Sequence, residues 1–379
     1  MRTIAIVGGK LQATEACYLA RHAGIRSTVI DIDPDAPARG MCDEFVCGNV
    51  IAEDPQVLDA LNKADMVLPA MENDAVLEKL VQLSERDGFI LAFDMDAYRI
   101  SESKHRSDAL FHRLGVPAPR YYPEGDFPFF AKEDGGSGSH GARRLDTQEE
   151  MDAYLKTAAK DAVIQECIEG PSYSVEIIGK PGNYRLYEIT QIHVDDGFDC
   201  NLVTTPCGEL TEEQKEGFLA DAVRIAEEMQ LSGIMDYECI LHDGQMKMLE
   251  IDARIPSQTP AAVLAATGMN ELEDLYDLFC HGDFRKDPGS KGWHAAYEHY
   301  LCSRGSMQSL GEHIMTEGGV LTLKEGFCES DETQTDYEEG SDVFRVTFIN
   351  SAGGKEELEK KRKRVAQCLQ DLQTHRNEG

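Results

Sequence analysis

Several features that define whole classes of protein are missing from this chain of 379 residues. Its eleven cysteines are scattered and no two of them form a CxxC pair, so the sequence offers neither a zinc motif nor a disulfide framework. No apolar run reaches the length of a membrane-spanning helix, and a predicted strand begins at residue 3, which leaves no room for a signal peptide. We therefore expect a soluble, cytoplasmic protein with reduced thiols and no membrane partner.

Positive charge is also scarce. Lysine and arginine number 37 against 69 aspartates and glutamates, which gives a formal net charge of −32. Such an excess repels the phosphates of nucleic acids, so no nucleic-acid partner is expected. The basic run at residues 360–364 falls on an amphipathic pattern and predicts the solvent-exposed face of a C-terminal helix. The acid excess also fits a high-salt cytosol, where exposed carboxylates keep a protein soluble.

What the sequence does contain begins with a βαβ unit. An apolar run at residues 3–7 is followed by a glycine turn, a helical pattern and a second apolar run. More apolar runs alternate with helical segments, which is typical of a parallel sheet; they lie at residues 44–47, 66–69 and 89–93. Residues 1–94 are therefore predicted to form an N-terminal Rossmann-like domain.

The first turn lacks the glycines of a dinucleotide site. A GxGxxG fingerprint needs glycines that let the pyrophosphate approach, but Gly8 and Gly9 are followed by Lys10 and by no third glycine in that turn. We expect no standard NAD site. Lys10 at a helix N-terminus can still hold a phosphate and Asp31 a ribose, although Asp31 is explained more simply as the cap of a turn.

A lysine and a glycine-rich loop follow in the middle of the chain. Lys132 ends the apolar strand predicted at residues 127–132, shortly before the glycines of residues 135–141. An ammonium group and the N–H groups of a flexible loop can together hold nucleotide phosphates, and Ser137 and Ser139 add hydroxyl donors. A solvent loop has the same composition, so this segment alone decides nothing.

An acidic strand end comes next, in the segment QECIEG at residues 165–170. A strand edge of this kind can offer backbone groups to an adenine, while Glu166 or Glu169 offers a carboxylate to ribose hydroxyls. The same residues also suit an exposed strand end.

The most informative pattern is an acidic hairpin. Glu238 lies on one predicted strand, a turn follows at residues 242–244, and Glu250 and Asp252 lie two residues apart on the next strand. Because such residues share a face and a hairpin sets its strands side by side, three carboxylates converge. Unpaired buried carboxylates are costly, and magnesium held together with ATP phosphates fits this ligand set. The alternative is a solvent-facing hairpin with exposed acids.

A basic residue and a polar turn complete the pattern. Arg254 follows Asp252 closely and can hold a γ-phosphate or stabilise the charge that develops on an acyl phosphate; its other role is a salt bridge to a neighbouring acid. The turn at Ser257, Gln258 and Thr259 suits substrate contacts and is also ordinary loop composition.

This order of lysines, glycine-rich loop, acidic hinge and Glu…Glu-x-Asp-x-Arg resembles the ATP-grasp superfamily over nearly the whole chain. Shorter strings narrow the resemblance to the 3-methylornithine–L-lysine ligases of pyrrolysine biosynthesis; they are GGKLQ at residues 8–12, AYRIS at 97–101, GIMD at 233–236, EIDAR at 250–254 and PSQTP at 256–260. The implied fold is an α/β ATP-grasp fold preceded by the Rossmann-like domain. Its central small lobe spans residues 95–178, and its C-terminal lobe, with the metal and substrate site, spans residues 179–379.

The resemblance also implies a reaction and its residues. The reaction joins the carboxylate of (3R)-3-methyl-D-ornithine to the ε-amine of L-lysine with ATP and Mg²⁺, and gives 3-methyl-D-ornithyl-Nε-L-lysine, ADP and phosphate; a homodimer is implied as well. By motif match, the nucleotide is bound by Lys104, Lys132, Ser139, Gln165, Glu166, Cys167, Ile168 and Glu169. Magnesium is bound by Glu238, Glu250 and Asp252. Methylornithine is surrounded by Ser174, Glu176, Asp236, Ser257, Gln258 and Thr259. The lysine site consists of Leu11, Gln12, Glu72 and Glu298.

Two segments qualify the resemblance. The segment at residues 193–201 matches the family and is implied to be a lid or pocket wall without a chemical role. The glycine-rich loop and the chain around Pro171 differ from the family, so the loop contacts transfer least securely.

From these residues we predict a two-step ligation. The donor carboxylate attacks the γ-phosphate of ATP with the help of magnesium, Lys132 and Arg254, and the ε-amine then attacks the acyl phosphate, with Asp236 as the acceptor of its proton. Two other interpretations stay open. The chain can be an ATP-grasp amino acid ligase with different substrates, or a nucleotide-binding protein without catalysis.

Overall fold

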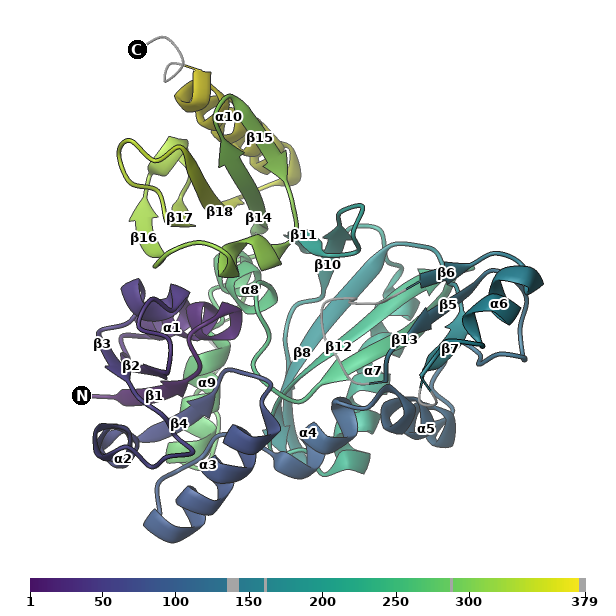
Figure 1. Cartoon of the computed structure of the whole chain (residues 1–379), viewed down its shortest axis with the longest axis horizontal. Coiled ribbons are helices and arrows are strands. Elements are labelled where there is room, and N and C mark those ends of the chain that lie inside the picture. The colour runs from purple at the N-terminus through teal and green to yellow at the C-terminus, as the bar shows by residue number, and fades with distance from the viewer. Residues whose placement is uncertain (135–142, 160–161, 287–288, 375–379) are drawn as a thin grey trace.

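The computed structural model describes residues 1–134, 143–159, 162–286 and 289–374. The N-terminal sheet and the small three-stranded sheet lie on opposite sides of a long antiparallel sheet, and the C-terminal helix stands at one end of the molecule (Figure 1).

The N-terminal part is a four-stranded parallel sheet in the order β3-β2-β1-β4. Its strands are β1 (Thr3–Val7), β2 (Arg26–Asp31), β3 (Glu44–Cys47) and β4 (Met66–Pro69). Its helical segments are α1 (Leu11–Ala23), η1 (Pro37–Gly40), α2 (Pro55–Lys63) and α3 (Asp74–Asp87). The predicted parallel sheet is confirmed. The run at residues 89–93 adds only a single parallel bridge between Leu91 and Val67, so it is not a full fifth strand.

The turn between β1 and α1 requires glycine at its first position. Gly8 has a φ of 114°, a conformation that residues with a side chain rarely adopt. A Cβ atom there would stand 2.5 Å from the carbonyl oxygen of Ala70, which follows β4. The chain can therefore turn tightly from sheet to helix while β4 lies directly alongside.

The small lobe follows two helices, α4 (Met95–Ser101) and α5 (Lys104–Leu114). Its sheet has the order β6-β5-β7, and its elements are β5 (Phe129–Lys132), β6 (Arg143–Leu145), α6 (Gln148–Tyr154) and β7 (Val163–Glu166). Phe129, Leu145 and Met151 are buried on one side of this sheet and form its core. Because strand side chains alternate, Phe130 and Lys132 point to the other side, toward the large sheet.

The long antiparallel sheet has the order β13-β12-β8-β10-β11-β14-β18-β17-β16, with β9 paired to β8 and β15 paired to β14. Its first strands are β8 (Ser172–Lys180), β9 (Asn183–Leu186), β10 (Thr190–Val194), β11 (Cys200–Thr205), β12 (Gly233–His242) and β13 (Gln245–Asp252). The others are β14 (His294–Ser303), β15 (Ser306–Ser309), β16 (Thr322–Glu325), β17 (Glu332–Thr335) and β18 (Val343–Ala352). Since β8 runs without interruption to Lys180, the lobe boundary expected at residue 178 falls inside a strand of this sheet.

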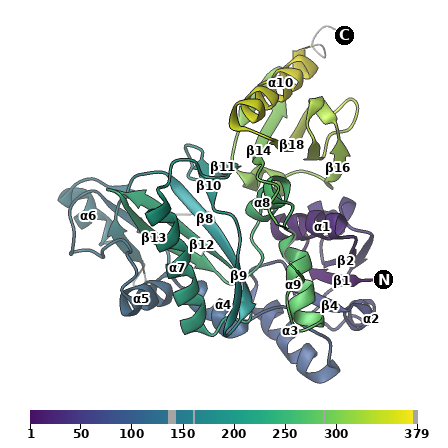
Figure 2. The same cartoon turned by 180° about the vertical axis from the view of Figure 1, so that it is seen from behind.

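The helices of the large lobe are α7 (Glu212–Met229), α8 (Thr259–Thr267), α9 (Glu271–Cys280) and α10 (Lys355–Thr374), with the short η2 (Glu312–Thr316) and η3 (Phe327–Glu329). Figure 2 shows α8 and α9 between α1 and the long sheet. One hydrophobic core joins these layers, and it includes Ile6 of β1, Leu19 of α1, Leu275 of α9 and Ile178 of β8. The N-terminal sheet therefore completes its core with helices that come much later in the chain.

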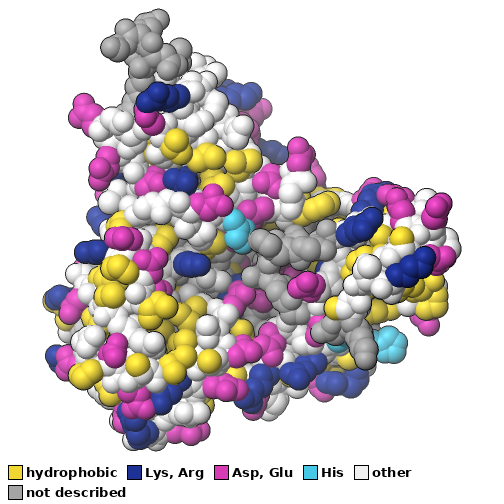
Figure 3. Space-filling view, viewed as in Figure 1, with side chains coloured by type: hydrophobic (Ala, Val, Ile, Leu, Met, Phe, Trp, Pro, Cys, Tyr) yellow, Lys and Arg dark blue, Asp and Glu magenta, His cyan; other side chains and the backbone are white. Residues whose placement is uncertain are grey.

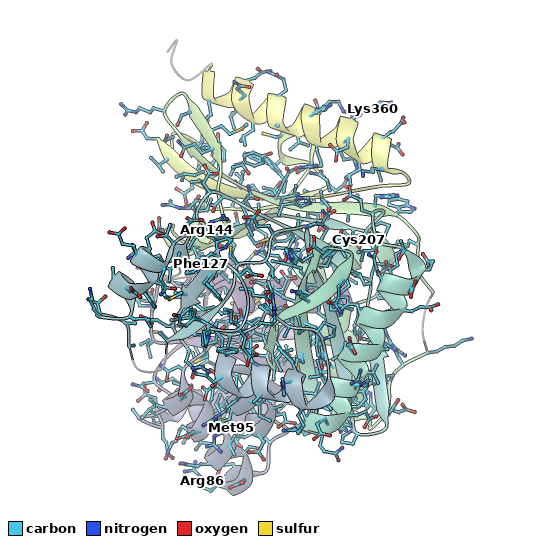
Figure 4. The ribbon with its side chains drawn as sticks, turned by 90° about the vertical axis from the view of Figure 1, so that its right-hand side faces the viewer. Arg86, Met95, Phe127, Arg144, Cys207 and Lys360 are labelled. Atoms are coloured by element: carbon cyan, nitrogen blue, oxygen red, sulfur yellow. The ribbon has the colours of Figure 1, made fainter. Side chains whose placement is uncertain are left out.

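The C-terminal helix α10 covers β18. Val365 and Leu369 are buried against Phe344 and Phe348. The predicted solvent-exposed basic face forms only in part, because two of its residues pair with acids: Lys361 Nζ lies 2.7 Å from Asp331 Oδ1, and Arg362 binds Glu298. Lys360 lies on the outer side of the helix, as Figure 4 shows.

Acidic side chains are distributed widely over the face of the molecule in Figure 3. Within the described part of the chain, none of the helices is both long enough and apolar enough to cross a membrane.

Candidate active site

The acidic hairpin forms as predicted. β12 and β13 are antiparallel, Glu238 stands opposite Glu250, and Asp236 stands opposite Asp252. Asp243, with a φ of 50°, helps the chain reverse in the connecting turn. Side chains that stand opposite each other in an antiparallel pair share a face. Four carboxylates therefore lie on one face at the edge of the long sheet.

The next strand extends this acidic face. Glu176 of β8 stands opposite Asp236, and Ser174 stands opposite Glu238. The hydroxyl of Ser174 donates a hydrogen bond to Asp236. Burial raises the pKa of Asp236 to about 6, against the opposing effects of Ser174 and Arg254. Burial and neighbouring carboxylates also raise the pKa of Glu238 well above its usual value. The carboxylates of this face therefore favour the approach of cations or the uptake of a proton.

Two lysines approach the hairpin from other elements. Lys104, the first residue of α5, is 7% exposed, and its Nζ lies 3.3 Å from Glu250 Oε1. Lys132 ends β5, where burial lowers the pKa of its ammonium group and the charge of Glu250 opposes that shift. Both lysines therefore lie around Glu250, where they can meet a phosphate chain that arrives with a metal ion.

An arginine joins the hairpin to the N-terminal part. Arg254 Nε lies 2.8 Å from Glu72 Oε1, and its Nη2 lies 3.3 Å from Asp252 Oδ2. Gln12 Nε2 in turn donates to Glu72 Oε1 across 3.3 Å. The guanidinium is thus fixed between two acids at the junction of the N-terminal sheet and the hairpin. Leu11 is the neighbouring first residue of α1 and is half-buried.

Oxygen ligands suit magnesium, and the carboxylates of Glu238, Glu250 and Asp252 supply them on one face. Within the described ranges, however, no three His, Cys, Asp or Glu side chains stand close enough to enclose one ion by themselves. Glu250 and Asp252 are each held by a cation, Lys104 and Arg254 respectively. The donor set therefore fits a magnesium ion that takes its other ligands from phosphates and water.

The acidic segment after β7 is held by basic residues. Burial alone would raise the pKa of Glu166, but hydrogen bonds from Arg120 and the charge of Lys247 lower it to about 2. Glu169 is exposed and pairs with Arg144, which Figure 4 shows on the small lobe. A cavity of about 450 Å³ lies beside this segment. Its lining includes Cys167, Ile168 and Lys247.

The face of β7 opposite Glu166 is turned toward Lys104 and Lys132. Gln165 is buried and donates to Asp108 Oδ2 across 2.6 Å, which fixes α5 to β7. The segment after β10 reaches over from the large lobe, where Phe198 meets Phe130 edge to face with ring centroids 5.8 Å apart. This position suits the predicted lid, and its aromatic pair borders the space between the lobes. Ser139 lies outside the described residues.

The polar turn before α8 is a γ-turn. Gln258 has φ 72° and ψ −55°, and the Thr259 N–H donates to the Ser257 carbonyl across 2.8 Å. A non-glycine residue in this conformation stores strain, which is common where a side chain is positioned for function. Gln258 Oε1 lies 3.0 Å from Nε2 of His299, whose pKa burial lowers to about 3. The neutral imidazole of His299 therefore donates a hydrogen bond that holds Gln258 in this turn.

Some predicted residues lie apart from the acidic face. Glu298 points to α10, where Arg362 binds both of its oxygens, at 3.2 and 3.0 Å. Asp31 Oδ1 accepts from the Asp33 N–H across 2.8 Å, which is the turn-capping role. Lys10 is exposed at the start of α1. The structure gives these three no contact with the hairpin.

Sequence reasoning missed two carboxylates beside Glu176. Glu15 of α1 and Glu271 of α9 are buried, and both lie close enough to Glu176 for their charges to interact. A glutamate within the apolar helical pattern of residues 11–23 was the signal for Glu15. Glu271 gave no signal, because an acid in the first turn of a helix is ordinary.

Comparison with known proteins adds a family context. The ATP-grasp domain family model matches residues 102–258. The chain is 34% identical to the 3-methyl-D-ornithine–L-lysine ligase of Methanosarcina barkeri, over 84% of this chain and 85% of that protein. It is 36% identical to the ligase of the same name from Methanosarcina mazei, over 84% and 83%. Among solved structures, the ADP complex of N5-carboxyaminoimidazole ribonucleotide synthetase superposes with a TM-score of 0.71 at 17% identity, over 98% of each chain.

Proposed function

Since the chain belongs to the family of 3-methyl-D-ornithine–L-lysine ligases, ATP-grasp enzymes, we propose that it joins the carboxylate of (3R)-3-methyl-D-ornithine to the ε-amine of L-lysine at the expense of ATP. The product is 3-methyl-D-ornithyl-Nε-L-lysine, an intermediate of pyrrolysine biosynthesis. The observation that carries the proposal is the acidic face of Glu238, Glu250 and Asp252, set between Lys104 and Arg254.

ATP occupies the space between the small lobe and the long sheet in this proposal. Lys104 and Lys132 hold its phosphates, since both approach Glu250 from the small-lobe side. The backbone of the segment after β7, with Gln165 to Glu169, holds the adenine and ribose. Magnesium, which ATP-grasp enzymes use with the nucleotide, would be held by Glu238, Glu250 and Asp252 and would neutralise phosphate charge.

In the first step the methylornithine carboxylate attacks the γ-phosphorus, and the bond to the ADP oxygen breaks. A carboxylate is a poor acylating agent, and the resulting acyl phosphate supplies the missing leaving group. Arg254 stabilises the charge on the transferred group, because its guanidinium is fixed by Glu72 and Asp252 before the reaction begins.

In the second step the ε-amine of L-lysine attacks the acyl carbon, the amide bond forms and phosphate leaves. The amine must lose a proton, and Asp236 is placed to accept it. With a pKa of about 6, this carboxylate is largely ionised at neutral pH and still basic enough to serve. Closure of the lobes keeps water from the acyl phosphate.

The two amino acids approach from different sides. Methylornithine lies along Ser174, Glu176 and the strained turn of Ser257, Gln258 and Thr259. Lysine enters from the N-terminal part, beside Leu11, Gln12 and Glu72, the last two of which are hydrogen-bonded to each other. The lysine role of Glu298 has no such support, since Arg362 already binds it.

We also propose a cytoplasmic location and a homodimer. The eleven cysteines are free thiols, which agrees with a reducing compartment where ATP is abundant. Size-exclusion chromatography with light scattering tests the dimer directly.

The proposal is tested with purified protein, ATP, Mg²⁺, D-ornithine as a surrogate donor and L-lysine. We expect an ornithyl-lysine mass with one ADP per product. Glu250→Ala removes a metal carboxylate and should lower the rate by at least about 10²-fold. The matched control is Glu228→Ala, an exposed acid on α7 that pairs with Arg113, which should keep full activity. ADP release with other amino acid pairs, and none with this pair, would assign the chain a different substrate.

A further inference from the structure

Three glutamates from three elements are buried together beside the proposed methylornithine site. Glu15 of α1 is 1% exposed, and Glu176 of β8 and Glu271 of α9 are 0% exposed. Among the described residues, no hydrogen-bond partner is found for either carboxylate oxygen of Glu176, for either of Glu271, or for Oε2 of Glu15. The other oxygen of Glu15 accepts from the Ala261 N–H at the start of α8, across 2.6 Å.

Such a cluster is unfavourable unless something offsets its charge. A buried carboxylate without a partner costs several kcal/mol. The charged groups that act most strongly on Glu271 are all acidic: Glu176, Glu15, Asp236 and Asp274. Within the described ranges these side chains also do not form a metal-ligand group. A cation that reaches several carboxylates by hydrogen bonds, as an ammonium group does with its three donors, fits better than a metal ion.

An extended diamino acid spans a little more than half the width of the acidic face between Asp252 and Glu176. Glu176 stands opposite Asp236, and Asp236 stands opposite Asp252, so Glu176 and Asp252 are two strand spacings apart, about 10 Å. An extended ornithine side chain places its terminal nitrogen about 6 Å from its carboxylate carbon. A donor whose carboxylate lies between Asp252 and Asp236 on this face can therefore bring its terminal amine to Glu176.

A further polar group lies beside the three glutamates. The hydroxyl Oγ1 of Thr259, on the strained turn, is buried and has no hydrogen-bond partner in the part of the chain that the structure describes. It neighbours Glu176, whose pKa it lowers against the larger effect of burial. The cluster thus meets the turn that the family resemblance assigns to the donor substrate.

We propose that Glu15, Glu176 and Glu271 form an ammonium pocket that receives the terminal amine of the donor amino acid, so that Glu15 and Glu271 are specificity-determining residues for a diamino acid. The inference rests on the proposed function for the identity of the donor. It adds α1 of the N-terminal part and α9 to the substrate site, and it explains why carboxylates without partners persist in the core.

The test compares D-ornithine with D-norvaline, which has the same carbon chain and no terminal amine. For the wild-type protein, kcat/KM for product formation with L-lysine should favour D-ornithine by about 10²-fold to 10⁴-fold. In Glu271→Gln and in Glu15→Gln the preference should fall at least tenfold, while KM for ATP and for L-lysine stays unchanged. The matched control is Asp277→Asn, a carboxylate two turns along α9 that pairs with His281. An unchanged preference in both folded glutamine variants would overturn the pocket.

Measurements of ligand binding test the ammonium pocket independently of the proposed reaction. Calorimetry with ADP and Mg²⁺ present, and without L-lysine, should show D-ornithine binding the wild-type protein at least tenfold more tightly than D-norvaline, with the difference lost in Glu271→Gln. If no ornithyl-lysine forms but this difference appears and disappears as stated, the reaction is wrong and the pocket stands. If the product forms but both ligands bind every variant alike, the pocket is wrong and the reaction stands. Failure of D-ornithine to bind at all counts against the pocket.

Discussion

At the scale of single residues, the charged groups of this protein divide into those with partners and those without. Arg362 holds Glu298 through two hydrogen bonds, and Arg254 is held between Glu72 and Asp252. Glu176 and Glu271 are just as buried, and their carboxylate oxygens have no hydrogen-bond partner within the described ranges. In our proposal the carboxylates of Glu176 and Glu271 receive a cationic ligand, whereas Glu298 is held by Arg362.

The pair of Glu298 and Arg362 gives a prediction that separates a structural from a substrate role. Arg362→Met should lower the free energy of unfolding by about 3–5 kcal/mol, because Glu298 is left buried and charged. The double variant Arg362→Met with Glu298→Gln should recover most of that loss. Urea denaturation followed by circular dichroism gives the free energies. Glu298→Gln alone should leave KM for L-lysine unchanged. A tenfold rise in that KM would show that Glu298 contributes to the lysine site.

Glu15 gives a prediction for pH. Burial raises its pKa from about 4.5 to about 8 in the folded protein, opposed by the N–H groups of Ala261 and Gln258 and reinforced by Glu312. Between those pH values the folded chain keeps a proton that the unfolded chain releases. Its stabilising contribution is therefore complete below about pH 4.5 and is lost as the pH rises through 8.

The ligand-free protein should accordingly lose stability between pH 5.5 and 8.5, and Glu15→Gln should flatten that slope. The expected difference is a few kcal/mol at most, about 1.4 kcal/mol for each unit of pKa. Urea titrations of both proteins across this range measure it. Parallel slopes for the wild type and the variant would show that Glu15 is ionised in the folded state.

At the scale of elements, the turns decide how the strands meet. Gly8 is the sharpest example, because β1, α1 and β4 all depend on it. Gly8→Ala should lower the free energy of unfolding by about 2 kcal/mol or more, since the new methyl meets the Ala70 carbonyl in a strained conformation. Gly24→Ala is the control; it has a φ of 63° but open space around it, so about 1 kcal/mol is expected. Equal losses in urea denaturation would remove the steric argument.

Strands could be predicted where the hydrophobic pattern and the turn residues indicated the same structure. The runs at residues 44–47 and 66–69 became β3 and β4, and the acidic hairpin has the predicted turn and facing acids, because period-two patterns and a polar turn specify register locally. The run at residues 89–93 looked the same but joined the sheet edge by one bridge only.

Contacts between segments that are distant in the chain could not be predicted from the sequence. Nothing local indicated that Glu15 would lie beside Glu176, 161 positions later, or that Arg362 would reach Glu298. Those positions depend on how helices pack on the long sheet. The γ-turn at Gln258 was equally hidden, because nothing in a glutamine signals a left-handed φ.

At the scale of the whole molecule, the dominant quantity is charge. With a net charge of −32, the acidic side chains repel one another in the folded state. Salt screens this repulsion over a Debye length of about 10 Å at 0.1 M and about 3 Å at 1 M. The melting temperature should therefore rise by several degrees between 0.05 and 1 M KCl. Calorimetry in sucrose of equal osmolality gives the control, because sucrose stabilises by exclusion without screening. A KCl effect no larger than that of sucrose would refute the charge argument.

The shared core of the N-terminal sheet has a consequence for the order in which the protein is made. Leu275 of α9 packs in the same core as Ile6 and Leu19, yet α9 ends at Cys280, 211 residues after β4 ends at Pro69. At a synthesis rate of about 5–20 residues per second, the sheet and α1 emerge on the order of 10–40 s before the helix that covers them. During translation the N-terminal part therefore keeps an apolar surface uncovered, and its core becomes complete only after the acidic hairpin has been synthesised.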